Sequence, residues 1–139
     1  MSQEKPNFAP LDWEKLAWEK TPYENVFISK IKEKQDPNSP NIPLYTVMAL
    51  KIESGAQIPL HRHNRELDWT ETITLPNGGW LETKSDHKSK KIKTENPFTI
   101  VIKTDEIFGL KNMDPLQPLY FFSTMKPGFM GYAEIEEIK

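Results

Sequence analysis

The chain has no cysteine among its 139 residues, which excludes disulfide bonds, cysteine zinc sites and thiol nucleophiles. It also lacks an excess of one charge, because 18 basic and 20 acidic side chains leave a formal net charge of -2. No apolar run approaches the roughly 18 residues of a membrane span, and the first residues contain no apolar signal region. We therefore expect a soluble, cytoplasmic protein that binds neither nucleic acid nor a membrane surface.

Aromatic residues are plentiful, with 4 Trp, 7 Phe and 4 Tyr in a chain that is 37% hydrophobic. A chain of this length and composition buries a core of its own without disulfide bonds. The polar start contains Pro6 and Pro10, and Asp12 is placed to cap a short helical turn. We expect an N-terminal arm over residues 1–17 and a folded domain over residues 18–139.

Most of the chain consists of short segments in which apolar and polar residues alternate, and turn residues separate these segments. Such a pattern predicts β-strands and an all-β sandwich or barrel. The turn Asn77-Gly78-Gly79 predicts a β-hairpin whose return strand is residues 79–85.

Residues 55–79 contain the strongest chemical signal. His61 and His63 are two positions apart, so on a strand both imidazoles point to one face. Further along, Trp69, Glu71 and Ile73 share a face, which places a carboxylate in an apolar row. A carboxylate is costly there unless it is paired or bound to a metal. Two histidines and one carboxylate suit Fe, Zn, Mn or Ni.

The same stretch resembles the first motif of the cupins. Gly55, the five residues after it and the His61-x-His63 pair follow that motif, and so do Glu71 and Gly78 with the six residues between them. The departure is an unusually long spacing between His63 and Glu71. Either an insertion precedes the strand and Glu71 is the carboxylate ligand, or Asp68 takes that place. The strand register favours Glu71.

A second cupin motif is degraded. Asn112 stands where that motif has an asparagine, but Phe108 stands where it has a histidine. The resemblance implies a double-stranded β-helix, or jelly-roll barrel, with a divalent metal and a small organic ligand at the barrel mouth. As an enzyme, such a protein would be metal-dependent and dioxygenase-, isomerase- or lyase-like. The alternative is a metal-free, non-catalytic cupin that binds a small molecule or acts as a dimeric interaction unit.

The remaining predictions concern the pocket and the partners. A homodimer is expected from the resemblance, and His87 is expected on the surface because it lies in a lysine-rich turn. No nucleophile paired with a base is evident, so the catalytic residues are left unassigned. The predicted pocket residues are Trp69, Ile73, Trp80, Phe108, Tyr120 and Phe122.

Overall fold

A computed structural model describes residues 12–65, 68–86 and 88–138, and this part of the chain is almost entirely β-structure. Two 3-10 turns, η1 (Trp13–Lys15) and η2 (Tyr132–Glu134), lie near its ends. The predicted all-β class is therefore confirmed. In chain order the strands are β1 (Glu19–Lys20), β2 (Val26–Asp36), β3 (Ser39–Ile52), β4 (Gln57–His63), β5 (Thr70–Leu75), β6 (Gly79–Ser85), β7 (Lys88–Thr94), β8 (Phe98–Lys103), β9 (Phe108–Asn112), β10 (Leu119–Lys126) and β11 (Ile135–Glu137).

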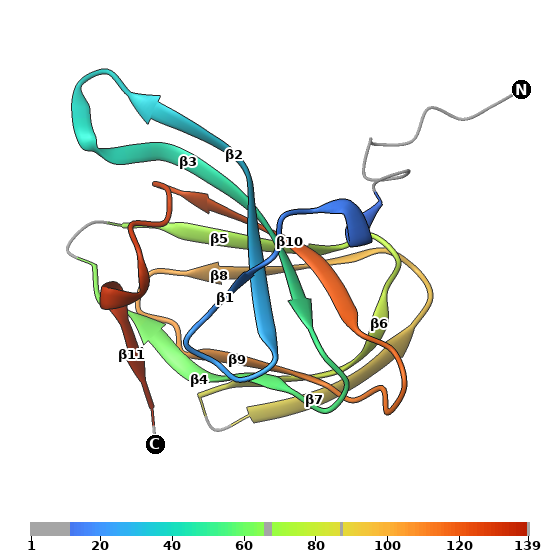
Figure 1. Ribbon diagram of the computed structural model, residues 1–139. Coiled ribbons are helices and arrows are strands. Elements are labelled where there is room, and N and C mark those ends of the chain that lie inside the picture. The colour runs from blue at the N-terminus through green and yellow to red at the C-terminus, as the bar shows by residue number, and fades with distance from the viewer. Residues whose placement is uncertain (1–11, 66–67, 87, 139) are drawn as a thin grey trace, which may run out of the picture.

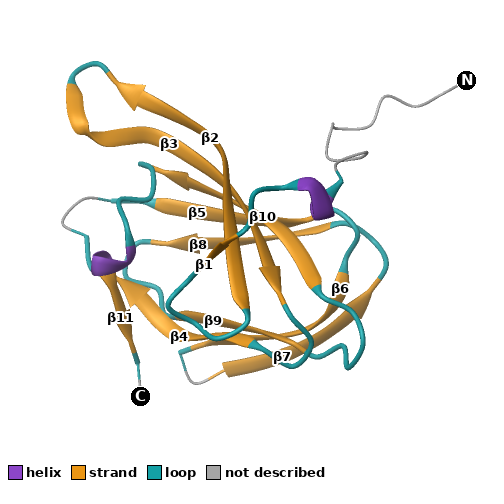
Figure 2. Cartoon of the chain, in the orientation of Figure 1, coloured by secondary structure: helices purple, strands orange, loops and turns teal. Residues whose placement is uncertain are grey.

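The strands form two antiparallel sheets that face each other across the core (Figure 1). One sheet has the order β1-β2-β3-β10-β5-β8, and the other has the order β11-β4-β9-β6-β7. Strands that are neighbours in space are mostly distant in sequence, as in a jelly roll (Figure 2). Large side chains from both sheets fill the space between them, and Leu75, Leu81, Leu110 and Phe121 are each 1% exposed or less.

The turn at Asn77-Gly78-Gly79 forms, but the predicted β-hairpin is wrong. Gly78 has a φ of +68°, and a Cβ there would lie 2.3 Å from the carbonyl oxygen of Thr94, so the position requires glycine. Strand β6 does not return along β5, because β10 and β8 already occupy both edges of β5. The turn therefore carries the chain from one sheet to the other.

The N-terminal turn η1 is held by the predicted cap, since the Asp12 side chain accepts a hydrogen bond from the Glu14 backbone N–H at 3.1 Å. Its Trp13 ring stacks on Tyr120 with ring centroids 5.1 Å apart and also contacts Phe122 at 4.8 Å. The described part of the predicted arm thus packs on strand β10. The division of the chain at residue 18 stays a prediction.

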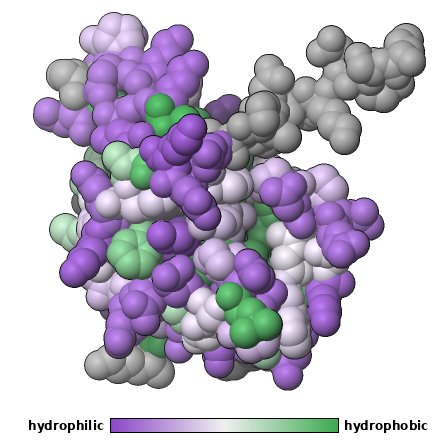
Figure 3. Space-filling model, turned by 45° about the vertical axis from the view of Figure 1, so that its right-hand side comes forward, coloured by the Kyte–Doolittle hydropathy of each residue, from purple (hydrophilic) through white to green (hydrophobic). Residues whose placement is uncertain are grey.

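The surface has apolar residues in several separate places. Among the described residues, the exposed large hydrophobic side chains come from different parts of the fold, and the face in Figure 3 is mainly hydrophilic with small hydrophobic areas between. These side chains are Ile31, Leu44, Val101, Leu116 and Met130.

Candidate functional site

A cavity of about 60 Å³ lies between the two sheets. Its walls are mainly apolar side chains of β2, β3, β5, β9 and β10, and the C-terminal residues Phe129, Tyr132 and Ile135 complete them. The side chains of His61 and His63 also line it. Since one buried water needs roughly 10–15 Å³, the space suits a few waters or a compact organic group. Concave, mostly apolar cavities with a few polar groups are the usual form of a ligand site.

A β-bulge directs both histidines into this cavity. Strand β4 pairs with β9 at Ile58 and again at His61, and the register shifts by one residue between these two pairs. A bulge of this kind changes which side chains face the core, so Ile58, His61 and His63 all line the cavity. The Nδ1 of His61 donates to the bulge carbonyl of Pro59 at 2.8 Å. The Nε2 of the neutral ring is then left as an acceptor.

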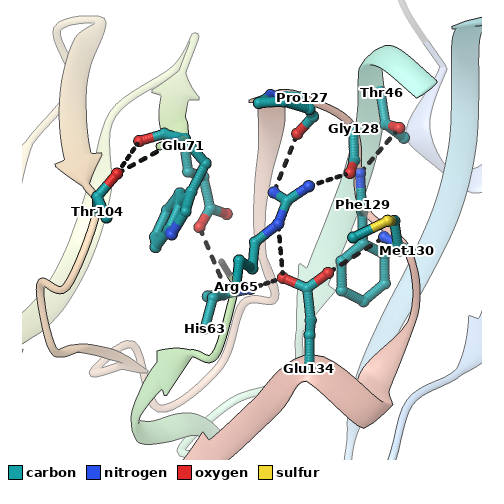
Figure 4. A network of polar contacts seen from close by, with 11 residues as sticks. Thr46, His63, Arg65, Glu71, Thr104, Pro127, Gly128, Phe129, Met130 and Glu134 are labelled. Atoms are coloured by element: carbon teal, nitrogen blue, oxygen red, sulfur yellow. Dashed lines mark hydrogen bonds and ion pairs between the residues drawn. The ribbon is translucent and has the colours of Figure 1, made fainter. Parts of the chain in front are cut away.

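His63 lies between two carboxylates (Figure 4). Its Nδ1 donates to Glu134 Oε2 at 2.5 Å, and its Nε2 is 3.9 Å from Glu71 Oε1. The side chain of His63 is 7% exposed and that of Glu134 is 6% exposed, so this hydrogen bond is shielded from water. A hydrogen bond to an ionised group is stronger than one between neutral groups, especially where water is excluded.

Glu71 is held from strand β10. The hydroxyl of Ser123 donates to Glu71 Oε2 at 2.6 Å. Ser123 pairs with Ile73 on the neighbouring strand β5, two positions from Glu71. The sequence prediction that Glu71 lies in an apolar row is confirmed, because Trp69 and Ile73 on the same face are 3% and 2% exposed. The serine hydrogen bond satisfies part of the carboxylate that burial would otherwise leave without a partner.

Glu134 is the residue that sequence reasoning missed. It belongs to η2 and is 71 residues away from its partner His63. Its Oε1 accepts the Met130 backbone N–H at 3.2 Å, and its Oε2 is 3.7 Å from Nε of the buried Arg65. Arg65 in turn donates to the carbonyls of Pro127 and Gly128, at 3.1 and 2.9 Å (Figure 4). Nothing in the local pattern around Glu134 distinguishes it from the neighbouring glutamates.

Burial sets the protonation of several groups around the cavity. It is the main cause that lowers the pKa of His61; the hydrogen bond to Pro59 opposes it, and the nearby His63 adds a smaller lowering effect. Burial also raises the pKa of Tyr23 and of Tyr132, with smaller contributions from nearby acidic groups. The neutral forms of these three side chains are therefore favoured.

The structure brings together five of the predicted site residues: His61, His63, Glu71, Ile73 and Phe108 all line the cavity. Phe108 pairs directly with His61 across β9 and β4. Trp69 lies beside the cavity, with its ring centroid 5.0 Å from that of His63. The alternative carboxylate, Asp68, is exposed and does not line the cavity, because it lies in the connection before β5.

Three of the predicted pocket residues lie elsewhere. Tyr120 and Phe122 alternate with the cavity-lining Phe121 and Ser123, so they point away from the cavity and pack against Trp13. Trp80 lies on β6, where Lys93 sits over its ring at 4.1 Å. These three side chains therefore do not line this cavity. The predicted surface position of His87 lies outside the described residues.

The polar side chains have the chemistry of metal ligands but do not have the spacing of a formed metal site. Within residues 12–65, 68–86 and 88–138, no three histidine, aspartate or glutamate side chains gather closely enough to hold an ion. His63 Nε2 and Glu71 Oε1 are 3.9 Å apart, and the other oxygen of Glu71 is hydrogen-bonded to Ser123. Donors that each lie about 2.0–2.2 Å from one ion usually approach one another more closely.

Comparisons with known proteins support the fold. No protein-family profile and no curated protein matches the sequence. Several solved structures match the fold. The polyketide cyclase RemF from Streptomyces resistomycificus has a TM-score of 0.66 at 12% identity, over 100% of this chain and 87% of that one. The Schizosaccharomyces pombe Cnp3 cupin domain has a TM-score of 0.60 at 10% identity, over 86% and 74%.

A cupin-like protein from Thermotoga maritima has a TM-score of 0.61 at 15% identity, over 88% of this chain and 84% of that one. In the described part of the chain, no helix is long and apolar enough to cross a membrane. The two facing antiparallel sheets and these structural similarities show that the chain has the cupin fold, the double-stranded β-helix.

Proposed function

We propose that this small cupin-fold protein binds a compact organic ligand in the cavity between its sheets, with His61, His63 and Glu71 contacting the polar part of that ligand. One observation carries the proposal: two imidazoles and a carboxylate line the same, otherwise mainly apolar cavity. Apolar walls supply affinity, and a few fixed polar groups supply orientation and specificity. RemF, which has the same fold, is a polyketide cyclase, and this agrees with an organic ligand.

The chemistry that the site offers is hydrogen bonding and proton transfer at His63 Nε2. Glu134 holds the opposite side of the imidazole, and Glu71 stands 3.9 Å from Nε2. A histidine held by a carboxylate has a fixed orientation and tautomer, as a general base requires.

A thermal-shift screen with compact organic fragments tests this proposal. A fragment that binds the folded protein raises its melting temperature by mass action. We expect a subset of fragments to do so for the wild type, and we expect their effect to shrink in Glu71→Gln. Glu82→Gln is a matched control, because Glu82 also accepts a serine hydrogen bond, from Ser89 at 2.8 Å, but does not line the cavity. Equal effects in both variants would contradict the proposal.

A divalent metal site is the second candidate function. The observation that favours it is that both imidazoles have Nδ1 hydrogen-bonded to an oxygen, of Pro59 for His61 and of Glu134 for His63. Metal-ligating histidines are usually held in this way. His61, His63 and Glu71 would be the protein ligands, and the Ser123 hydrogen bond to Oε2 leaves Oε1 of Glu71 for the metal. A metal bound there would act as a Lewis acid.

Elemental analysis of protein purified without a histidine tag or chelator tests the metal candidate. Near-stoichiometric iron, zinc, manganese or nickel in the wild type, lost in the His61→Ala/His63→Ala variant, is the result expected for a metal site. Absence of metal, together with an unchanged melting temperature on addition of these ions, would contradict it.

A further inference from the structure

The hydrogen-bonding polarity of His61 and His63 is fixed by contacts with Pro59 and Glu134, which do not line the cavity. A carbonyl oxygen only accepts hydrogen bonds, so the contact of His61 Nδ1 with Pro59 O at 2.8 Å requires a proton on Nδ1. The Nε2 of that neutral ring then carries a lone pair and no proton. His61 therefore presents an acceptor at its free nitrogen.

The same argument applies to His63 and Glu71. A carboxylate also accepts only, so the contact of His63 Nδ1 with Glu134 Oε2 at 2.5 Å places the proton on Nδ1 and leaves Nε2 of the neutral ring as an acceptor. The Glu71 carboxylate already takes the Ser123 hydroxyl proton on Oε2 and has Oε1 remaining. The three side chains thus offer two ring nitrogens and one carboxylate oxygen, all of them acceptors.

We infer that the site selects a ligand whose polar group donates hydrogen bonds, a hydroxyl or an amine on a compact apolar body, and that Glu134 is the positioning residue that sets the contribution of His63 to this preference. The inference rests on the proposed ligand-binding function of the cavity. An acceptor-only group on the ligand, such as an ether or a carboxylate, would leave the three acceptors unpaired and desolvated.

Glu134 is held so firmly that it, and not the imidazole, decides the tautomer. Its Oε1 is fixed by the Met130 N–H at 3.2 Å, and Arg65 Nε lies 3.7 Å from its Oε2. Its neighbour Glu136 provides a contrast within the same segment, because Glu136 is exposed and pairs with the exposed Arg62 at 2.7 Å.

The Glu134→Gln variant is nearly isosteric and is expected to reverse the polarity of His63. The glutamine carbonyl oxygen takes over the contact with the Met130 N–H, which leaves the amide NH₂ facing His63 Nδ1. An amide N–H donates, so Nδ1 becomes the acceptor and the imidazole proton moves to Nε2. His63 then presents a donor to the cavity.

The ¹⁵N chemical shifts of the imidazole nitrogens test this directly, because they report which nitrogen carries the proton. From the contact of Nδ1 with Glu134, we expect His63 to be protonated at Nδ1 alone in the wild type and in Glu136→Gln. In Glu134→Gln we expect the proton on Nε2. A wild-type His63 protonated at Nε2, either alone or together with Nδ1, would overturn the inference.

Phenol and anisole serve as test ligands, since both have a phenyl ring and only phenol has a hydroxyl donor. One hydrogen bond corresponds to roughly a tenfold change in affinity, so phenol should bind the wild type and Glu136→Gln about tenfold more tightly than anisole. In Glu134→Gln the ratio should fall below its wild-type value, because His63 then presents a donor while His61 and Glu71 still present acceptors. Equal wild-type affinities would overturn the inference while the cavity remains a ligand site. Binding of neither probe would overturn both.

Discussion

The two faces of strand β10 contact different parts of the molecule. On the inner face, Phe121, Ser123 and Met125 line the cavity, and Ser123 holds the Glu71 carboxylate. On the outer face, Tyr120 and Phe122 receive the Trp13 ring of the N-terminal turn. Residues one position apart on the same strand thus serve either the site or the anchoring of a terminal segment. The face of the strand on which a residue lies, and not its aromatic character, decides which of these two roles it has.

Truncation of the inner face should have the largest effect on stability. Phe121 is 1% exposed, and Phe121→Ala removes a large side chain from the closed core. We expect the free energy of unfolding to fall by about 3–5 kcal/mol, measured by urea denaturation. Tyr120→Ala, on the half-buried outer face, should cost clearly less. Equal losses would remove the distinction between the two faces.

Removal of the Ser123 hydroxyl should have an intermediate effect. Ser123→Ala leaves Glu71 Oε2 without its donor in a partly buried position, which should cost about 1–3 kcal/mol of unfolding free energy. The matched variant is Thr124→Ala on the other face of β10, where surface substitutions usually stay within about 0.5 kcal/mol. A Thr124→Ala loss as large as that of Ser123→Ala would contradict this account of the inner face.

Removal of the Trp13 ring from the outer face of β10 should have a smaller effect on stability. Trp13→Ala deletes the stacking contact with Tyr120, and aromatic pairs of this kind contribute about 0.5–1.5 kcal/mol beyond area burial. Because this ring lies outside the cavity, fragment binding should stay unchanged in the thermal-shift assay. Loss of fragment binding in Trp13→Ala, with the fold retained, would place the outer face in the site after all.

The smallest effect should be a pH dependence caused by His61. Its folded-state pKa is lowered by burial, so below about pH 6.5 the unfolded chain takes up a proton that the folded chain does not. The contribution of His61 is therefore fully present above about pH 6.5 and is lost as the pH falls toward its folded-state pKa. Measured by urea denaturation, the free energy of unfolding should decline more steeply with falling pH for the wild type than for His61→Asn. Parallel pH curves for the two proteins would contradict a lowered pKa of His61 in the folded state.

Local pattern was sufficient to predict much of the site. Period-two alternation places Glu71 and Ile73 on the same inner face as the buried Trp69, and the structure confirms this register. The same argument places both histidines on one cavity wall. The roles of His61, His63 and Glu71 as metal ligands stay a prediction, as do the homodimer and the cytoplasmic location.

Tertiary partners could not be predicted. Glu134 reaches His63 only because β11 pairs with β4, and this pairing has no signal within either segment. Likewise, the β-hairpin expected at Asn77-Gly78-Gly79 fails because residues distant in sequence occupy both edges of β5. Which of Phe121 and Phe122 faces the cavity depends on the register of β10 with its neighbouring strands, since two adjacent phenylalanines do not indicate which one is inside.

The most direct test of the central claim, that the cavity is a ligand site, uses the methionine methyl groups as reporters. Met48 and Met125 line the cavity, whereas Met113 does not. In ¹³C-methyl-methionine protein titrated with phenol, we predict saturable shifts of the Met48 and Met125 signals and a stationary Met113 signal. Unchanged Met48 and Met125 signals at saturating phenol, or shifts at Met113 alone, would contradict it.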